Sequence, residues 1–106
     1  MGLFEFFKRP DINEGLQQYH AAPGAVLLDV RTPQEYEQGR IPGSQNLPLG
    51  DFGRLAELAP DRSAPLFVYC LSGARSGQAV TALRQMGYQN VTNIGGISEY
   101  RGKVER

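Results

Sequence analysis

The sequence has few of the residues that form disulfides, metal sites or membrane spans. Among its 106 residues there is one cysteine, Cys70, and one histidine, His20. An intrachain disulfide and a CxxC redox pair are therefore excluded, and a zinc site, which needs several such ligands, is not expected. No run approaches the roughly 18 apolar residues of a membrane-spanning helix. We expect a cytoplasmic protein with no metal, no cofactor and no membrane partner, and with His20 exposed to solvent.

The chain also lacks a surplus of either charge. Eleven Lys and Arg residues offset eleven Asp and Glu residues, so the formal net charge is zero. This balance argues against binding to nucleic acid or to an anionic membrane surface. The length corresponds to one domain, and the content of 41% hydrophobic and 21% charged residues is typical of a globular protein. We expect a single domain over residues 1–106, of which residues 1–10 form an N-terminal extension.

The N-terminal extension is apolar but short. Its basic pair, Lys8 and Arg9, follows the apolar residues, which is the reverse of the order in a secretory signal. We expect Phe4, Phe6 and Phe7 to cover an edge of the sheet, with a contact to another protein as the alternative.

Short apolar runs alternate with helical patterns along the chain. Apolar runs are typical of strands buried on both faces, and they occur at residues 25–30 and 66–69. A third strand is predicted at residues 91–94. A short extended piece is expected at 45–48. Helices are predicted over residues 12–19, 33–38 and 51–59, and from about Ser76 to a stop at Gly87. This order indicates an α/β fold with a mostly parallel central sheet and helices on both faces.

The predicted helix at 33–38 carries the clearest start signal. Thr32 suits the N-cap, Pro33 suits the first helical position, and Glu35 completes a capping box. Gly39 is expected to end this helix.

Cys70 directly follows a buried strand and precedes a glycine-rich loop. In parallel sheets ligands bind beyond the carboxyl ends of the strands, so residues 29–31 and Cys70 are expected to lie near one another. The backbone N–H groups of residues 71–75 and of the following helix can turn toward one point and bind an anion. Arg75 is the nearby cation, and no Asp or Glu occurs from Arg62 to Ser98. These features predict a stabilised Cys70 thiolate.

A purely structural interpretation of the same residues is that Cys70 is a small, inert core residue, as most free cysteines are. The glycine-rich loop, Arg75 and the following helix favour the reactive interpretation. Asp29 is expected to have a structural role, either orienting Arg31 or capping the loop beyond the strand. Tyr69 is expected to belong to the core.

The sequence resembles the rhodanese family of sulfurtransferases over roughly residues 12–100. Four blocks carry the resemblance, in the family's order: residues 28–36 (LDVRTPQEY), 39–48 (GRIPGSQNLP), 70–75 (CLSGAR) and 95–100 (GGISEY). The resemblance implies a rhodanese-like three-layer sandwich.

The resemblance also implies an enzyme of the thiosulfate sulfurtransferase type. Cys70 would take a sulfane sulfur from thiosulfate or a persulfide donor, hold it as a persulfide, and pass it to a thiol or to cyanide. The residues expected to bind the substrate are Arg31, Leu71, Ser72, Gly73, Ala74 and Arg75. The implied partners are a small anionic sulfur donor and an external thiol or thioredoxin-like acceptor, and the protein would be a monomer or a weak dimer. Because some thiosulfate-specific members have a basic residue where this chain has Ser72, a persulfide or protein-bound donor is an open alternative.

Two other functions compete with sulfur transfer. Phosphatases built on this fold have a longer loop between the cysteine and the arginine, whereas four residues separate Cys70 from Arg75 and leave less room for a phosphate. The residues just after the loop also include no Asp to act as a general acid. A non-catalytic persulfide carrier or interaction module is the second alternative, against which the intact cysteine and loop argue.

Overall fold

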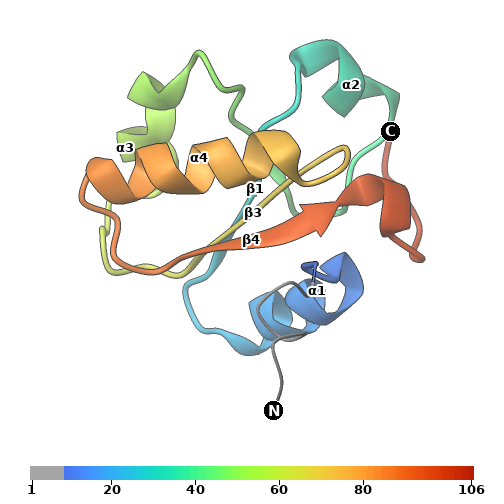
Figure 1. The fold of residues 1–106 in the computed structure, drawn as a ribbon, viewed down its shortest axis with the longest axis horizontal. Coiled ribbons are helices and arrows are strands. Elements are labelled where there is room, and N and C mark those ends of the chain that lie inside the picture. The colour runs from blue at the N-terminus through green and yellow to red at the C-terminus, as the bar shows by residue number, and fades with distance from the viewer. Residues whose placement is uncertain (1–8) are drawn as a thin grey trace.

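A four-stranded parallel sheet forms the centre of the protein (Figure 1). The computed structural model describes residues 9–106, so the expected positions of Phe4, Phe6 and Phe7 lie outside the described residues. The strand order is β2-β1-β3-β4, and every neighbouring pair is parallel. The strands are β1 (Val26–Asp29), β2 (Gln45–Asn46), β3 (Leu66–Cys70) and β4 (Val91–Gly96). The predicted parallel sheet is confirmed.

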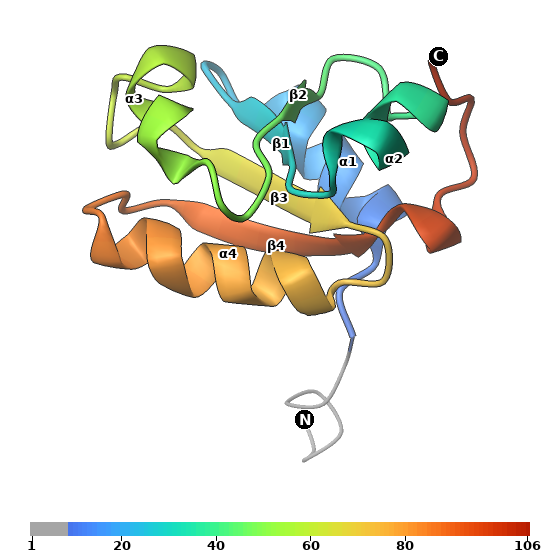
Figure 2. The ribbon, with the colours of Figure 1, turned by 90° about the horizontal axis from the view of Figure 1, so that it is seen from above.

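Helices cover both faces of this sheet, as predicted. The α-helices are α1 (Ile12–Ala21), α2 (Pro33–Gln38), α3 (Leu55–Leu58) and α4 (Ala74–Gln85), and two short 3₁₀ turns are Phe52–Arg54 and Ile97–Glu99. Helix α1 lies on one face, while α3 and α4 lie on the other, and α2 lies on the α4 side (Figures 1 and 2). None of the helices in residues 9–106 combines the length and apolar character that crossing a membrane requires.

Two apolar cores hold the layers together. Successive residues of a strand face opposite sides of the sheet, so in β1 Leu28 packs in the core under α4, whereas Leu27 packs in the core under α1. Gly15 allows α1 to lie close to β4, because a Cβ at this position would collide with the Ile94 side chain. This close approach explains a glycine inside a helix, where it normally costs stability.

Several predicted elements have other boundaries in the structure, and three of these differences bear on the site or the fold. Helix α4 begins at Ala74 rather than near Ser76, because Gly73 adopts a positive φ of 105° and completes the turn of the loop. Strand β4 continues to Gly96 instead of ending at Ile94. The predicted helix over 51–59 is a 3₁₀ turn followed by the short α3. The predicted capping box of Thr32 and Glu35 is confirmed.

Candidate active site

The carboxyl ends of β1 and β3 lie side by side at one edge of the sheet (Figure 2). Asp29 pairs with Tyr69 in the register of the two strands, and the Val30 N–H donates to the Tyr69 carbonyl at 3.0 Å. Residues 29–31 therefore lie beside Cys70, as predicted. Tyr69 is fully buried, which confirms its core role, and His20 is exposed.

The Cys70 sulfur lies beneath the start of α4. Its Sγ accepts hydrogen bonds from the Gly73 N–H at 3.0 Å and from the Ser76 N–H at 3.3 Å. The Ser76 Oγ lies 3.4 Å from the same sulfur, and Cys70 itself has no exposed surface. The sulfur is therefore buried, and two backbone N–H groups point at it. Backbone N–H groups that face one point in this way can bind an anion.

Gly73 is required where the loop meets α4. Its φ of 105° lies in a region that side chains other than glycine rarely adopt, and a Cβ there would approach the Gly95 backbone at 3.5 Å. This turn directs the Gly73 N–H at the sulfur while the residue forms the N-terminal end of α4.

The surroundings of Cys70 favour its thiolate. Burial by itself raises the pKa of the Cys70 thiol, because a charged sulfur is poorly solvated there. Hydrogen bonds from the side chain and backbone of Ser76 and from the backbone of Gly73 outweigh burial, so the pKa is lowered from its ordinary value. A thiolate is the nucleophilic form of cysteine, and this site therefore suits attack on an electrophilic atom.

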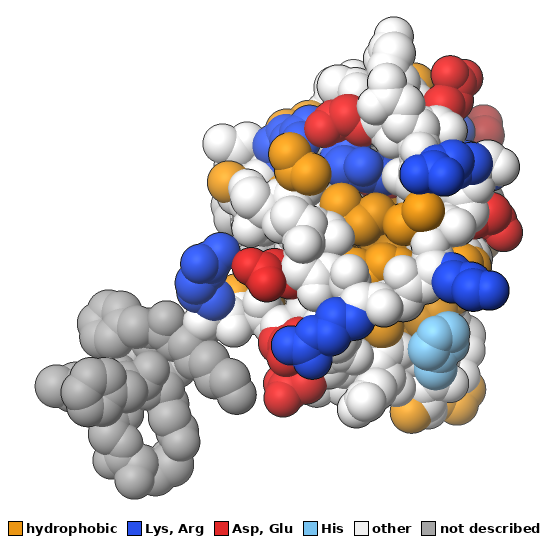
Figure 3. Space-filling model, turned by 90° about the vertical axis from the view of Figure 1, so that its right-hand side faces the viewer, with side chains coloured by type: hydrophobic (Ala, Val, Ile, Leu, Met, Phe, Trp, Pro, Cys, Tyr) orange, Lys and Arg blue, Asp and Glu red, His pale blue; other side chains and the backbone are white. Residues whose placement is uncertain are grey.

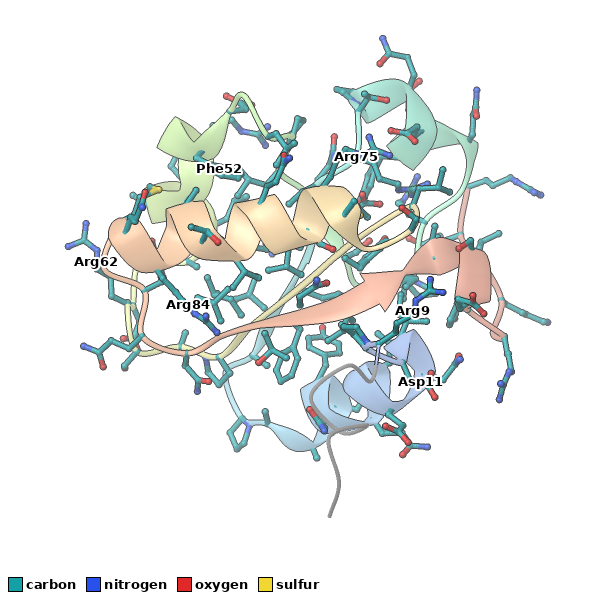
Figure 4. The ribbon with its side chains drawn as sticks, in the orientation of Figure 1. Arg9, Asp11, Phe52, Arg62, Arg75 and Arg84 are labelled. Atoms are coloured by element: carbon teal, nitrogen blue, oxygen red, sulfur yellow. The ribbon has the colours of Figure 1, made fainter. Side chains whose placement is uncertain are left out.

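Arg75 pairs with a residue of α2. Its guanidinium donates to both carboxylate oxygens of Glu35, at 2.7 and 3.0 Å, and the side chain lies between α4 and α2 (Figure 4). Hydrogen bonding to Arg75 lowers the pKa of Glu35 to about 2. The sequence indicates only the capping-box role of Glu35. Its pairing with Arg75 leaves no local pattern, because Arg75 lies 40 positions later in the chain.

Arg31 is held by Asp29, as predicted. Its guanidinium donates to the two carboxylate oxygens of the fully buried Asp29, with Nη2 to Oδ2 at 2.6 Å, and to the Gly39 carbonyl at 2.7 Å. Arg31 and Leu71 line the same cavity of about 390 Å³ next to the loop. Arg31 thus has a fixed position at the edge of the candidate active site.

The other predicted loop residues line the outside of the turn. Leu71 is 46% exposed, and Ser72 and Ala74 are also exposed. Figure 3 shows the side of the molecule to which this edge of the sheet points, where hydrophobic side chains are bordered by Lys and Arg. Within residues 9–106, no group of three His, Cys, Asp or Glu side chains comes together to hold a metal.

Sequence analysis missed Ser76 and Asn93. Ser76 is fully buried in the first turn of α4, and its hydroxyl donates to the Asn93 Oδ1 at 2.7 Å. A small hydroxyl residue just after the loop is a local signal for Ser76. Asn93 belongs to β4, and only the sheet brings it to the loop.

Comparisons with known proteins show the family to which the chain belongs. The family model of the rhodanese-like domain matches residues 13–103. Thiosulfate sulfurtransferase PspE of Escherichia coli is 41% identical over 73 residues, which cover 68% of this chain and 70% of that protein. A sulfurtransferase of Allochromatium vinosum is 46% identical over 88 residues, which cover 80% of each chain.

A solved structure, described as a rhodanese with anions from E. coli, has the same fold. It superposes with a TM-score of 0.73 and 36% identity, over 77% of this chain and 98% of the other. The residues that the family model matches, 13–103, include all four strands and Cys70. The chain therefore belongs to the rhodanese-like domain family.

Proposed function

We propose that the protein is a sulfurtransferase that carries a sulfane sulfur on Cys70. The observation that carries this proposal is the pair of backbone N–H groups, from Gly73 and Ser76, that donate to the Cys70 sulfur. The two relatives named as sulfurtransferases support it, since they are 41% and 46% identical to this chain over the aligned residues.

The reaction consists of two displacements at sulfur. The Cys70 thiolate attacks the outer sulfur of thiosulfate, the sulfur–sulfur bond of the donor breaks, and sulfite leaves with the bonding electron pair. Cys70 then holds a persulfide whose outer sulfur is negatively charged. An acceptor thiolate attacks that outer sulfur, and the Cys70 thiolate is released. No external oxidant or reductant is needed, because the sulfur moves at the same oxidation level.

The loop residues have distinct roles in this proposal. The backbone N–H groups of Leu71, Ser72, Gly73, Ala74 and Arg75 stabilise the negative outer sulfur. Arg31 attracts the anionic donor from its position beside the cavity. Arg75 contributes positive charge at the end of the loop while paired with Glu35.

The proposed partners follow from the surface beside the loop. Leu71 and Val104 are exposed apolar side chains that line one cavity with Arg31 and Arg106. A small anionic donor, thiosulfate or a persulfide, meets the arginines, while an external thiol or thioredoxin-like acceptor contacts the apolar side chains. We propose that residues 1–106 act as one domain, as a monomer or weak dimer, in the cytoplasm, where reducing conditions keep the single cysteine active.

The intact mass of the protein tests this proposal. Incubation with thiosulfate, or with a small persulfide, should add the mass of one sulfur atom, and a thiol acceptor should remove it. Cys70→Ser should gain no mass, while Met86→Leu, a change at an exposed position on the far end of α4, should gain the same mass as the wild type. A wild-type protein that never acquires the sulfur from either donor contradicts the proposal. Release of phosphate from an aryl phosphate in a Cys70-dependent manner would instead favour a phosphatase.

A further inference from the structure

We propose that Asn93 is a positioning residue of the Cys70 site, which holds the first turn of α4 so that its hydrogen-bond donors face the sulfur. This inference rests on the proposed function of Cys70 as a nucleophile. It assigns a role in that chemistry to a residue of the neighbouring strand that does not touch the sulfur.

The side chain of Asn93 is fixed by its own strand. The pairing of β3 with β4 is irregular here: Val68 pairs with Asn93, but the next residue, Tyr69, pairs with Gly95. At this irregularity the Gly95 N–H donates to the Asn93 Oδ1 at 2.9 Å. A backbone N–H of the same strand therefore holds the Asn93 amide in place, independently of the contacts that the amide makes with α4.

From this position the amide reaches two groups at the start of α4. Its Nδ2 donates to the Gly73 carbonyl at 3.2 Å, and its Oδ1 accepts the Ser76 hydroxyl at 2.7 Å. Gly73 and Ser76 are also the two residues whose N–H groups donate to the Cys70 sulfur. Asn93 thus holds both residues that stabilise the thiolate.

The Ser76 hydroxyl connects Asn93 to the sulfur. It has one hydrogen and lies near three competing acceptors, which are the Asn93 Oδ1 at 2.7 Å, the Gly73 carbonyl at 3.0 Å and the Cys70 Sγ at 3.4 Å. When Cys70 is a thiol, its proton can point to the Ser76 Oγ while Ser76 donates to Asn93. When Cys70 is a thiolate, the Ser76 hydroxyl can turn to the sulfur, and the Asn93 Oδ1 retains the Gly95 N–H. In both states the Asn93 Nδ2 donates to the Gly73 carbonyl and holds the start of α4 in place.

The charged groups near the site are paired with one another. Arg75 of α4 pairs with Glu35 of α2, and Arg31 pairs with Asp29 at the end of β1. Residues 91–96 of β4 and 66–70 of β3 include no charged side chain. The effect of Asn93 on Cys70 therefore passes through hydrogen bonds.

The test measures the pKa of Cys70 in variants of Asn93. Cys70 is the only thiol in the chain, so the pH profile of alkylation by iodoacetamide reports on it alone. Asn93→Ala releases the first turn of α4, so its N–H groups face the sulfur less well, and the apparent thiol pKa should rise by up to about one unit, the scale of one hydrogen bond to the charged form. Asn93→Asp should raise it further, because a carboxylate cannot donate to the Gly73 carbonyl and repels the thiolate. The matched controls Asn90→Ala and Asn90→Asp change an exposed residue before β4 and should leave the profile unchanged.

A double variant separates positioning from a simple structural role. In the Ser76→Ala background, the shift caused by Asn93→Ala should fall to less than half, since one of its two routes to the sulfur is gone. An unchanged pKa in folded Asn93→Ala, or a full shift in the Ser76→Ala background, would overturn the proposal. Circular dichroism shows whether each variant folds. If Asn93→Ala does not fold, an unchanged Cys70 pKa in folded Asn93→Asp overturns the proposal. If neither variant folds, Asn93 serves the fold alone, and the proposal is likewise overturned.

Failure of this inference is distinguishable from failure of the proposed function. Alkylation requires no sulfur donor, so the Asn93 shift can be measured in a protein that never forms a persulfide. Conversely, normal persulfide formation with no Asn93 shift would leave the proposed function intact and overturn the inference.

Discussion

Arg75 donates two hydrogen bonds to Glu35, at 2.7 and 3.0 Å, and so joins the first turn of α4 to the first turn of α2. Glu35 also accepts the Thr32 N–H in the capping box at 2.9 Å. The Glu35 carboxylate therefore contacts both the end of the loop that follows Cys70 and the start of the helix that follows Arg31. The orientation of these two segments depends on the same ion pair.

Removal of this carboxylate should lower stability. Glu35→Gln replaces a charge-assisted pair by a weaker one and is expected to cost about 1 kcal/mol, the range of half-exposed ion pairs and helix caps. Urea unfolding of the variant should show a lower midpoint with the same slope. Glu37→Gln changes an exposed residue of the same helix and should leave the midpoint unchanged. Equal midpoints for wild type and Glu35→Gln would show that the pair adds nothing to stability.

The contribution of Glu35 should depend on pH. Because hydrogen bonding to Arg75 lowers its pKa from 4.5 to about 2 in the folded protein, this stability is fully present above about 4.5 and is lost as the pH falls toward 2. The difference in free energy of unfolding between wild type and Glu35→Gln should therefore be about 1 kcal/mol at pH 5 and should shrink as the pH is lowered to 2. A difference that stays constant over that range would contradict the ionic origin of the effect.

The Ser76 hydroxyl should help to ionise Cys70. Ser76→Ala removes a hydrogen bond that lowers the pKa of the thiol, so the pKa should rise by about one unit and alkylation near neutral pH should slow by up to tenfold. The pH profile of iodoacetamide alkylation measures both quantities. Thr81→Ala removes an exposed hydroxyl from the same helix and serves as the control. A pH profile identical to that of the wild type would show that the Ser76 hydroxyl does not stabilise the thiolate.

Gly73 should tolerate no side chain. In Gly73→Ala the positive φ of 105° becomes strained, at a cost of about 1–2 kcal/mol, and relief of that strain turns the N–H away from the sulfur. We expect slower sulfur uptake together with lower thermal stability. Gly53→Ala, in open space and without a positive φ, should affect neither. Wild-type sulfur uptake by Gly73→Ala would show that this N–H contributes little.

Local signals in the sequence predicted the features that depend on neighbouring residues. Thr32, Pro33 and Glu35 mark the start of α2 within four positions, and the apolar run before Cys70 marks β3. The start of α4 is predicted two residues late, because the sequence does not show which glycine ends the loop: Gly73 has the positive φ, whereas Gly77 lies inside the helix.

Features that depend on distant residues could not be predicted in this way. The sequence predicts Arg75 as the cation near the sulfur, but it does not show that Arg75 pairs with Glu35, which lies 40 positions earlier in the chain. The contact of Asn93 with Gly73 depends on the irregular pairing of β3 with β4, which shifts the register by one residue. Neither relationship leaves a periodic or compositional trace in the sequence.

The contact between Gly15 and Ile94 links the two sides of the sheet. Helix α1 lies on the face opposite α4, yet it touches the residue directly after Asn93. A larger side chain at position 15 would have to displace Ile94, and with it the point where β4 meets the loop. We therefore expect a side chain at position 15 to change the reactivity of the thiol from the face of the sheet opposite α4.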